Sequence, residues 1–202
     1  TAIVVTVFVA LVLLGGLKRI SSVAQVVVPF MAIAYVLFAI LVICFNVKAV
    51  PDAFRQIFEG AFNPKAVTGG AIGSIIVVMQ KGIARGIFSN EAGLGSAPIA
   101  AAAARTDEPV RQGLVSMLGT FFDTIVICTM TGLAIIITGA WKSGADGYAV
   151  TELAFGNGLP IPDKISSFVL MLCLTFFAFT TILGWNYYSE KCLEYLTGGK
   201  MK

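Results

Sequence analysis

The stretch GIARGIFSNEAGLGSAP, residues 82–98, lies inside a long apolar region that runs from Ala66 to Ala104. Glycine costs about 1 kcal/mol relative to alanine in a helix interior. Serine and asparagine offer the backbone hydrogen bonds that compete with the helix. The stretch has both features, with Ser89 and Asn90 flanked by Gly82, Gly86, Gly93 and Gly95. It therefore predicts a membrane helix that is broken near residues 88–93.

An unwound backbone inside a bilayer must turn its freed N–H and C=O groups toward protein, water or a ligand. Free N–H groups attract a carboxylate, and free carbonyls attract a cation or an ammonium group. A zwitterionic amino acid needs both. The alternative is a glycine seam for helix packing, with Ser96 as an N-cap before Ala97 and Pro98. Arg85 and Glu91 in the same apolar stretch favour a ligand site, because packing glycines do not explain them.

The composition indicates a membrane protein. Hydrophobic residues make up 57% of the chain and charged residues 12%, against about 45–50% and about 25% in soluble domains. The chain has no histidine, and Cys44, Cys128, Cys173 and Cys192 form no CxxC pair, which argues against a zinc or haem site. The net charge of +3 is too small and dispersed for a nucleic-acid partner. We predict no enzymatic activity and no cofactor.

Apolar runs of about 20 residues predict spanning helices. We expect one transmembrane bundle over residues 1–202, with crossings at about 1–17, 23–45, 80–104 (broken near 88–93), 113–140 and 165–188. The apolar positions Phe54, Ile57 and Phe58 predict an interfacial helix over about 51–62. Residues 1–17 are interpreted as the tail of a spanning helix, and the chain as part of a longer protein. Basic residues in the short connections place those connections in the cytoplasm.

Several stretches resemble the alanine or glycine:cation (sodium) symporter family of amino acid carrier proteins. They are residues 82–98 with the alanines and Thr106-Asp107 that follow, PVRQGL at 109–114 leading to GTFFDT at 119–124, FAFTTILGWNYY at 177–188, and KRI at 18–20 with VPFMA at 28–32. The resemblance implies an all-α polytopic membrane protein, part of a five-plus-five inverted-repeat (LeuT-like) bundle. The helices here would be the fourth to the eighth, with the sixth discontinuous, and the first and third outside this chain.

The resemblance further implies sodium-coupled symport of alanine or glycine across the cytoplasmic membrane by alternating access. Sodium would be the coupling ion, and the partners would be a small neutral amino acid, the lipid bilayer and the rest of the same chain. A proton-coupled carrier, in which Glu91 or Asp123 titrates, is the first alternative. A membrane-embedded enzyme or respiratory subunit is the second, and the lack of histidine and of a nucleophile–base pair argues against it.

The expected substrate-binding residues lie at the break and on the last crossing. At the break they are Phe88, Ser89, Asn90, Glu91 and Gly93. By resemblance, Thr181 and Trp185 line the amino acid pocket, and Thr180, Thr181 and Phe177 form part of a sodium site, since oxygen ligands suit a small hard cation. Two alternatives stay open. Threonines in membrane helices often bond their own i−4 carbonyl, and Trp185 with Tyr187 and Tyr188 fits an interfacial aromatic belt.

Asp123 lies inside a predicted crossing, in line with Ser116, Thr120 and Thr131 at helical spacing. A charge there must face protein or water. It is either a cation-coupling or gating carboxylate, or a structural partner of Arg85 or Lys81 that holds two helices together. Asp123 and Arg85 are therefore candidates for coupling or structural charges.

Overall fold

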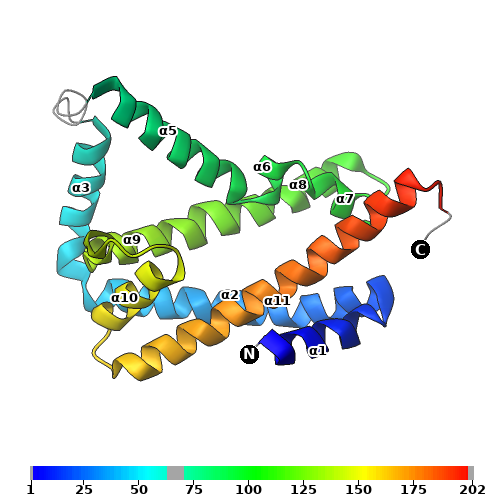
Figure 1. Ribbon diagram of the computed structural model, residues 1–202, viewed down its shortest axis with the longest axis horizontal. Helices are drawn as coiled ribbons and strands as arrows, with labels where there is room; N and C mark the ends of the chain where they lie inside the picture. Colours follow the sequence, from blue (N-terminus) through cyan, green and yellow to red (C-terminus); the bar gives the residue numbers. More distant parts are fainter. Residues whose placement is uncertain (1, 63–70, 200–202) are drawn as a thin grey trace. The chain divides into compact units, whose positions relative to one another are not determined.

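The computed structural model describes residues 2–62 and 71–199, and every regular element within them is a helix (Figure 1). The longest are α2 (Gly16–Phe45) and α11 (Asp163–Leu196). The third long helix is continuous from residue 109 to residue 137 and consists of α8 (Pro109–Thr120), the π-helical segment η2 (Phe121–Cys128) and α9 (Thr129–Ile137). The prediction of an all-α chain is confirmed for these residues.

Three helical ranges in the described part are long and apolar enough to cross a membrane: Arg19–Phe45, Pro109–Ile137 and Asp163–Leu196. They coincide with the crossings expected at 23–45, 113–140 and 165–188, although each helix starts earlier. The helix at 113–140 ends sooner than expected, because Gly139 adopts a left-handed φ of 69° after Ile137, a conformation that glycine tolerates without a Cβ penalty.

The first helix also ends sooner than the expected range of 1–17. α1 covers Ala2–Leu13, and the chain turns at Leu14 and Gly15 before Gly16, with φ 65°, opens α2. The glycine pair permits this turn because Gly16 needs no Cβ in the left-handed region. The basic residue Arg19 therefore lies in the first turns of α2 and not in a loop.

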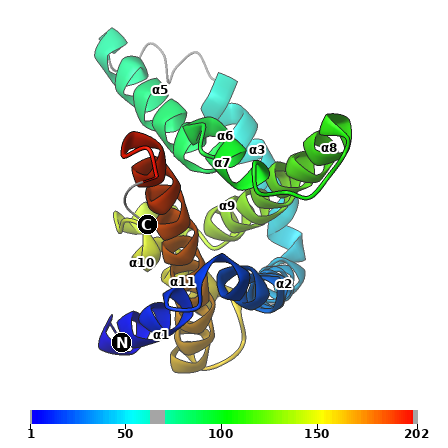
Figure 2. The same cartoon turned by 90° about the vertical axis from the view of Figure 1, so that its right-hand side faces the viewer.

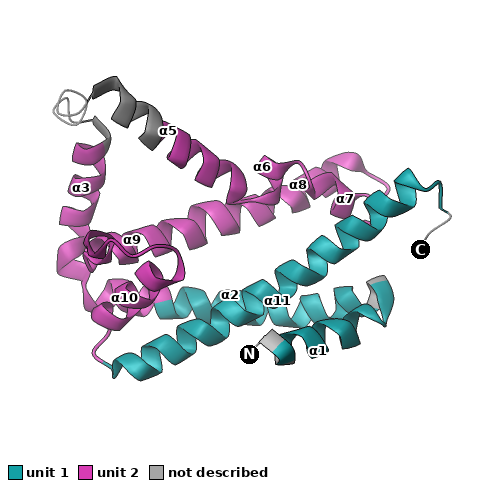
Figure 3. Ribbon diagram, in the orientation of Figure 1, with its two compact units in different colours: residues 1–38, 161–202 teal, residues 39–160 magenta. Residues whose placement is uncertain are grey.

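The chain divides into two compact units, which are described separately (Figure 3). Unit 1 comprises residues 1–38 and 161–202, where α1 packs along α11 (Figure 2). Its buried centre is Val12, Ile20 and Leu183, surrounded by partly buried Val9, Leu13, Val23 and Phe179. Tyr35 of α2 meets Phe177 of α11 edge to face, with 5.8 Å between the ring centroids.

Unit 2 comprises residues 39–160. It holds η1 (Val47–Ala49), α3 (Val50–Phe62), η3 (Ala140–Ser143) and α10 (Tyr148–Gly158), besides the helices around the predicted break. α3 and α10 both pack against α9. Ala53, Ala134 and Ala154 are fully buried, and such small side chains let membrane helices approach closely.

Asn46 ties the end of α2 to the end of α10 inside unit 2. Its Nδ2 donates to the carbonyl oxygens of Val42 at 2.8 Å and of Gly158 at 2.7 Å. The contact is tight, since a Cβ on Gly158 would lie 2.6 Å from Val42 Cγ1 and 3.1 Å from Thr138 Cγ2. One amide thus satisfies two helix-end carbonyls that would otherwise lack partners.

We expect the substitution Asn46→Ala to destabilise the full-length protein by about 2 kcal/mol, because each lost hydrogen bond contributes about 1 kcal/mol. Thermal unfolding in detergent should show a Tm that is lower by a few degrees. Gln56→Ala is the matched control, since the Gln56 amide bonds Asp52 one turn away on α3 and such a pair contributes about 0.2–0.5 kcal/mol. Equal Tm values for the two variants would contradict the bridging role of Asn46.

Candidate functional site

The apolar region around residues 82–98 is interrupted where the sequence predicts it. α5 (Ala71–Phe88) ends at Phe88, and the next helical residues belong to α6 (Glu91–Leu94) and α7 (Ala97–Ala101). Asn90 is extended, with φ −141° and ψ 150°, and its Oδ1 accepts a hydrogen bond from the Ala92 backbone N at 2.9 Å. Asn90 therefore caps α6 through the side-chain competition expected of asparagine.

Glycine is needed at two places after the break. Gly93 lies so close to the end of α5 that a Cβ would overlap the carbonyl oxygen of Ile87 and come within 3.1 Å of its carbonyl carbon. Gly95 closes α6 in the left-handed region at φ 77°, and its N–H donates to the Glu91 carbonyl. Ser96 precedes α7 as expected, but its hydroxyl makes no capping bond. Gly93 and Gly95 thus shape a compact turn.

Asn90 also links the break to the neighbouring helix, at the junction of α8 and η2. Its Nδ2 donates to Asp123 Oδ2 at 3.1 Å, and its Oδ1 accepts from Thr120 Oγ1 at 3.4 Å. Beside it, Ser89 Oγ and Cys128 Sγ are 3.3 Å apart. We call Ser89, Asn90, Thr120, Asp123 and Cys128 the break cluster. It joins two segments thirty or more residues apart in sequence, so the polar side chains at the break have polar partners on the neighbouring helix, as a bilayer requires.

The π-helical winding of η2 explains how Asp123 and Cys128 both reach the break. Residues five apart do not share a face in an α-helix. The i→i+5 bonding of a π-helix brings such residues closer to one face, and π segments occur frequently at functional sites. Asp123 and Cys128 are five apart and contact Asn90 and Ser89 respectively. Thr120, just before η2, completes this face.

The ion-pair interpretation of Asp123 does not match the structure. Lys81 and Arg85 are exposed, and among the described side chains neither forms a salt bridge with Asp123. The partner of Asp123 is the neutral amide of Asn90. The carboxylate is therefore held by a hydrogen bond, and no described cation neutralises it.

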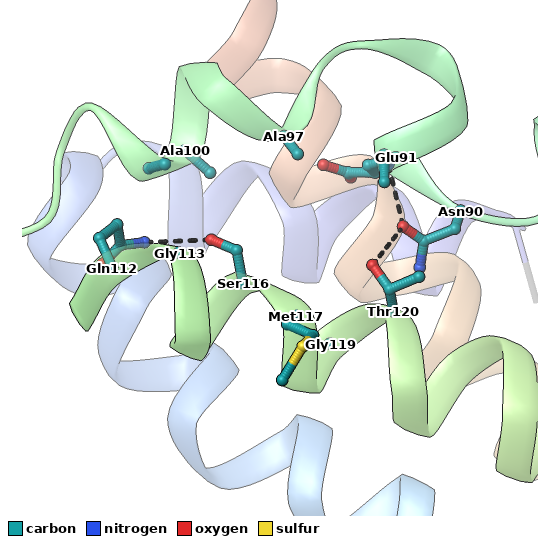
Figure 4. A pocket seen from close by; sticks show the side chains of 12 residues that line it. Asn90, Glu91, Ala97, Ala100, Gln112, Gly113, Ser116, Met117, Gly119 and Thr120 are labelled. Atoms are coloured by element: carbon teal, nitrogen blue, oxygen red, sulfur yellow. Dashed lines mark hydrogen bonds between the residues drawn. The ribbon is translucent and has the colours of Figure 1, made fainter. Parts of the chain in front are cut away.

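An open pocket lies between the break and α8 (Figure 4). One wall comes from Asn90, Glu91, Ala97 and Ala100, and the other from α8 residues that include Gln112, Gly113, Ser116 and Thr120. Its volume of about 520 Å³ is within the range of about 300–1,000 Å³ found for small-molecule sites. In Figure 4 the hydroxyl of Ser116 and the side chain of Glu91 extend into the space between the two walls.

The candidate residues of α11 belong to unit 1. Thr181 Oγ1 donates to the Phe177 carbonyl at 2.8 Å, and Thr180 Oγ1 is 3.0 Å from the same carbonyl and 3.1 Å from that of Phe176. Both threonines therefore bond their own helix, as the alternative interpretation expects. Trp185 is half-exposed and meets Tyr188 edge to face at 6.0 Å. The binding roles of Phe177, Thr180, Thr181 and Trp185 stay predictions.

Sequence reasoning missed Cys128 as a contact of the break and considered it only as one of four cysteines that form no CxxC pair. Its position, five residues after Asp123, gives no shared face in a regular α-helix, and only η2 reveals the relation. Gln112 was also missed as a pocket residue. The sequence contains a signal for Gln112, because Gln112, Ser116 and Thr120 are spaced four residues apart and so share one helix face.

Comparisons with known proteins agree with the resemblance. A profile described as the sodium:alanine symporter family matches residues 1–202. An uncharacterized transporter of Haemophilus influenzae is 55% identical over 98% of this chain and 43% of its own length. The sodium/alanine symporter AgcS of Methanococcus maripaludis is 48% identical, over 99% and 44%. The amino-acid carrier protein AlsT of Bacillus subtilis is 41% identical, over 98% and 41%.

The chain spans less than half the length of each of these relatives. The match nevertheless covers the whole chain, from α1 through the broken helix to α11. The expectation of a transporter and not an enzyme is confirmed at the level of the family. The chain thus belongs to the sodium:alanine symporter family, whose members are integral membrane transporters.

Proposed function

We propose that the intact protein is a sodium-coupled symporter of a small neutral amino acid, alanine or glycine, in the cytoplasmic membrane. This chain would supply the broken helix at which substrate and cation bind. The observation that carries the proposal is the break cluster, in which Asp123 lies beside a backbone that has left the helix. Family membership agrees with this activity.

The described half of the site favours positive charge. The carbonyls of the last turn of α5 have no partners within that helix, and a helix C-terminus carries about half an elementary negative charge. The Asp123 carboxylate adds a full charge at the same place. The Ala92 N–H of the turn already donates to Asn90 Oδ1. We therefore propose that this chain binds the cation and the substrate ammonium, while the rest of the protein binds the substrate carboxylate.

No covalent chemistry is required of these residues. The transported amino acid would be selected by pocket volume and by the pairing of its two charges. Phe88, Ser89, Asn90, Glu91 and Gly93 would line the pocket at the break. As the family resemblance implies, Thr181 and Trp185 would line an amino acid pocket, and Phe177 with both threonines would form part of a cation site. We also propose the LeuT-like inverted-repeat bundle, working by alternating access.

The test is uptake of labelled alanine by the full-length protein in proteoliposomes, with an inward sodium gradient against an equal potassium gradient. We expect accumulation only with sodium, and competition by unlabelled glycine. Substitution of Thr181 should lower uptake about tenfold or more, since one charge-assisted contact contributes about 1.5–3 kcal/mol, and substitution of Asn90 should lower it further. Uptake that does not depend on sodium and does not change with these substitutions would refute the proposal.

Proton coupling is the second candidate, and the Asp123 carboxylate at the break is the observation that favours it. We expect Asp123→Asn and Glu91→Gln to leave the pH dependence of uptake between pH 5 and pH 8 unchanged if sodium alone is the coupling ion. Loss of a proton-driven component in either amide variant, measured without sodium, would instead assign proton coupling to that carboxyl. Each amide keeps the shape of the acid, so a change in pH dependence reports the charge and not the packing.

A further inference from the structure

We infer that the pocket between the break and α8 is a water-filled cation passage, which connects the break cluster with the membrane face at which α8 begins. This inference rests on the proposed function, because it describes how the coupling cation reaches or leaves the break. It assigns a role to Gln112 and Ser116, which lie outside the break cluster, and a second role to Thr120.

The pocket extends along most of α8. Its lining runs from Gln112, in the first turn of the helix, to Thr120 at its end beside Asn90. At about 1.5 Å per residue this stretch is about 12 Å long, a substantial part of the hydrocarbon thickness of about 30 Å. One end lies in the break cluster, and the other lies next to the polar connection that precedes Pro109. The pocket thus leads from mid-helix to a helix end.

The polar side chains of α8 lie on the side of the helix that faces the pocket. Gln112, Ser116 and Thr120 recur every fourth residue on one face, which is the face that lines the pocket. Gln112 Nε2 donates to Ser116 Oγ at 3.4 Å, and Thr120 reaches Asn90 at 3.4 Å. The other faces carry apolar residues such as Leu114 and Leu118, both half-exposed. A polar stripe on a spanning helix faces protein or water and not lipid.

The side chains that line the pocket include an acidic residue and no basic one in the described part of the chain. Glu91 is the one ionisable residue among those that line the pocket in the described part of the chain, and Asp123 lies at its inner end. The other polar groups are oxygen-bearing side chains, which suit a small hard cation and its hydration water. Negative lining raises the local concentration of cations and repels anions. A substrate carboxylate would be disfavoured there.

The opposite wall leaves space for hydrated ions. Ala92, Ala97, Ala100 and Ala101 line the side formed by α6 and α7, and their methyl groups are the smallest side chains besides glycine. On α8 the lining includes Gly113 and Gly119 beside the larger Met117. The alanines and glycines of the two walls keep the pocket open where two helices would otherwise interlock their side chains.

The test is thiol accessibility in the full-length protein. Ser116→Cys is compared with Leu118→Cys on another face of α8, and a membrane-impermeant cationic methanethiosulfonate is added from either side of the membrane. Modification is quantified by mass spectrometry of the α8 peptide, so the native cysteines stay in place. Because the reactive thiolate forms only in contact with water, we expect Ser116→Cys to react at least about tenfold faster, from one side only. Sodium should slow this reaction and leave Leu118→Cys unaffected.

A second pair keeps the test valid if Ser116→Cys fails to fold. Gly113→Cys lines the pocket and Leu114→Cys does not, so the same difference in rate is expected. We also compare the reaction rates of a cationic and an anionic reagent. At position 116 the ratio of the cationic to the anionic rate should be about five times the ratio for free cysteine. Reaction at the rate of the leucine controls, or without charge preference, while alanine uptake remains sodium-dependent, would overturn the passage alone. Loss of sodium dependence in the unsubstituted protein would overturn the proposed function instead.

Discussion

Replacement of Asn90 by alanine is expected to lower sodium-driven alanine uptake by at least about 100-fold. The substitution removes the cap on the Ala92 N–H and the hydrogen bonds to Asp123 and Thr120. A lost cap costs about 1 kcal/mol, and a hydrogen bond to a charged group contributes about 1.5–3 kcal/mol. Together they amount to about 2.5–4 kcal/mol, and roughly 2.8 kcal/mol corresponds to a factor of 100. Initial rates of uptake are measured in proteoliposomes at a series of substrate concentrations and are normalised to the amount of reconstituted protein.

Two comparisons separate the role of Asn90 from general damage to the turn. Ser96→Ala serves as the matched control, because the Ser96 hydroxyl is buried without a hydrogen-bond partner in the described structure, and uptake should change less than about threefold. Asp123→Ala removes one partner of Asn90 and should give an intermediate loss. If Asn90→Ala and Ser96→Ala transport equally well, the break cluster does not organise the site.

Replacement of Gly93 by alanine is expected to abolish transport. The added Cβ would overlap the Ile87 carbonyl oxygen, and a backbone neighbour cannot rotate away as a side chain can. Either the end of α5 or the α6 turn must move, which displaces Asn90 from Asp123. Overpacking of this kind costs about 1–3 kcal/mol or more. Uptake assays, together with size-exclusion profiles of the purified protein, distinguish a displaced site from a misfolded protein.

Gly86→Ala is the matched control for Gly93→Ala. Gly86 lies inside α5 and a Cβ there meets nothing within 4 Å. Alanine is favoured over glycine in a helix interior by about 1 kcal/mol, so this variant should keep its stability and most of its uptake. If instead Gly86→Ala is inactive and Gly93→Ala is active, the close approach of Gly93 to Ile87 has no part in transport.

The break itself could be predicted from the sequence because its cause is local. Asn90 caps the turn with its own side chain, and Gly95 takes a left-handed conformation two residues after Gly93. Both effects depend on residue type and on the nearest neighbours along the chain. The glycine at position 93 was predicted as part of the site, but the reason for it was not. Its close neighbour Ile87 is revealed only once the chain has turned back on itself.

The partner of Asp123 is the clearest difference between expectation and structure. Charge complementarity favoured Arg85 or Lys81, whereas the carboxylate accepts its hydrogen bond from Asn90. Sequence spacing places Asp123 on a helix face but contains no information on which residue of another helix lies opposite. The π-helical η2 changes that face again, and so brings Cys128 to Ser89.

The membrane location, the helical class, the position of the break and its polar residues follow from the sequence alone, since hydropathy and helix propensity act over one or two turns of chain. The tertiary structure alone establishes which groups meet across the break, the winding of η2 and the pocket beside α8. The contacts and the pocket depend on how separate helices pack together, and packing geometry is a property of the folded chain and not of any single segment.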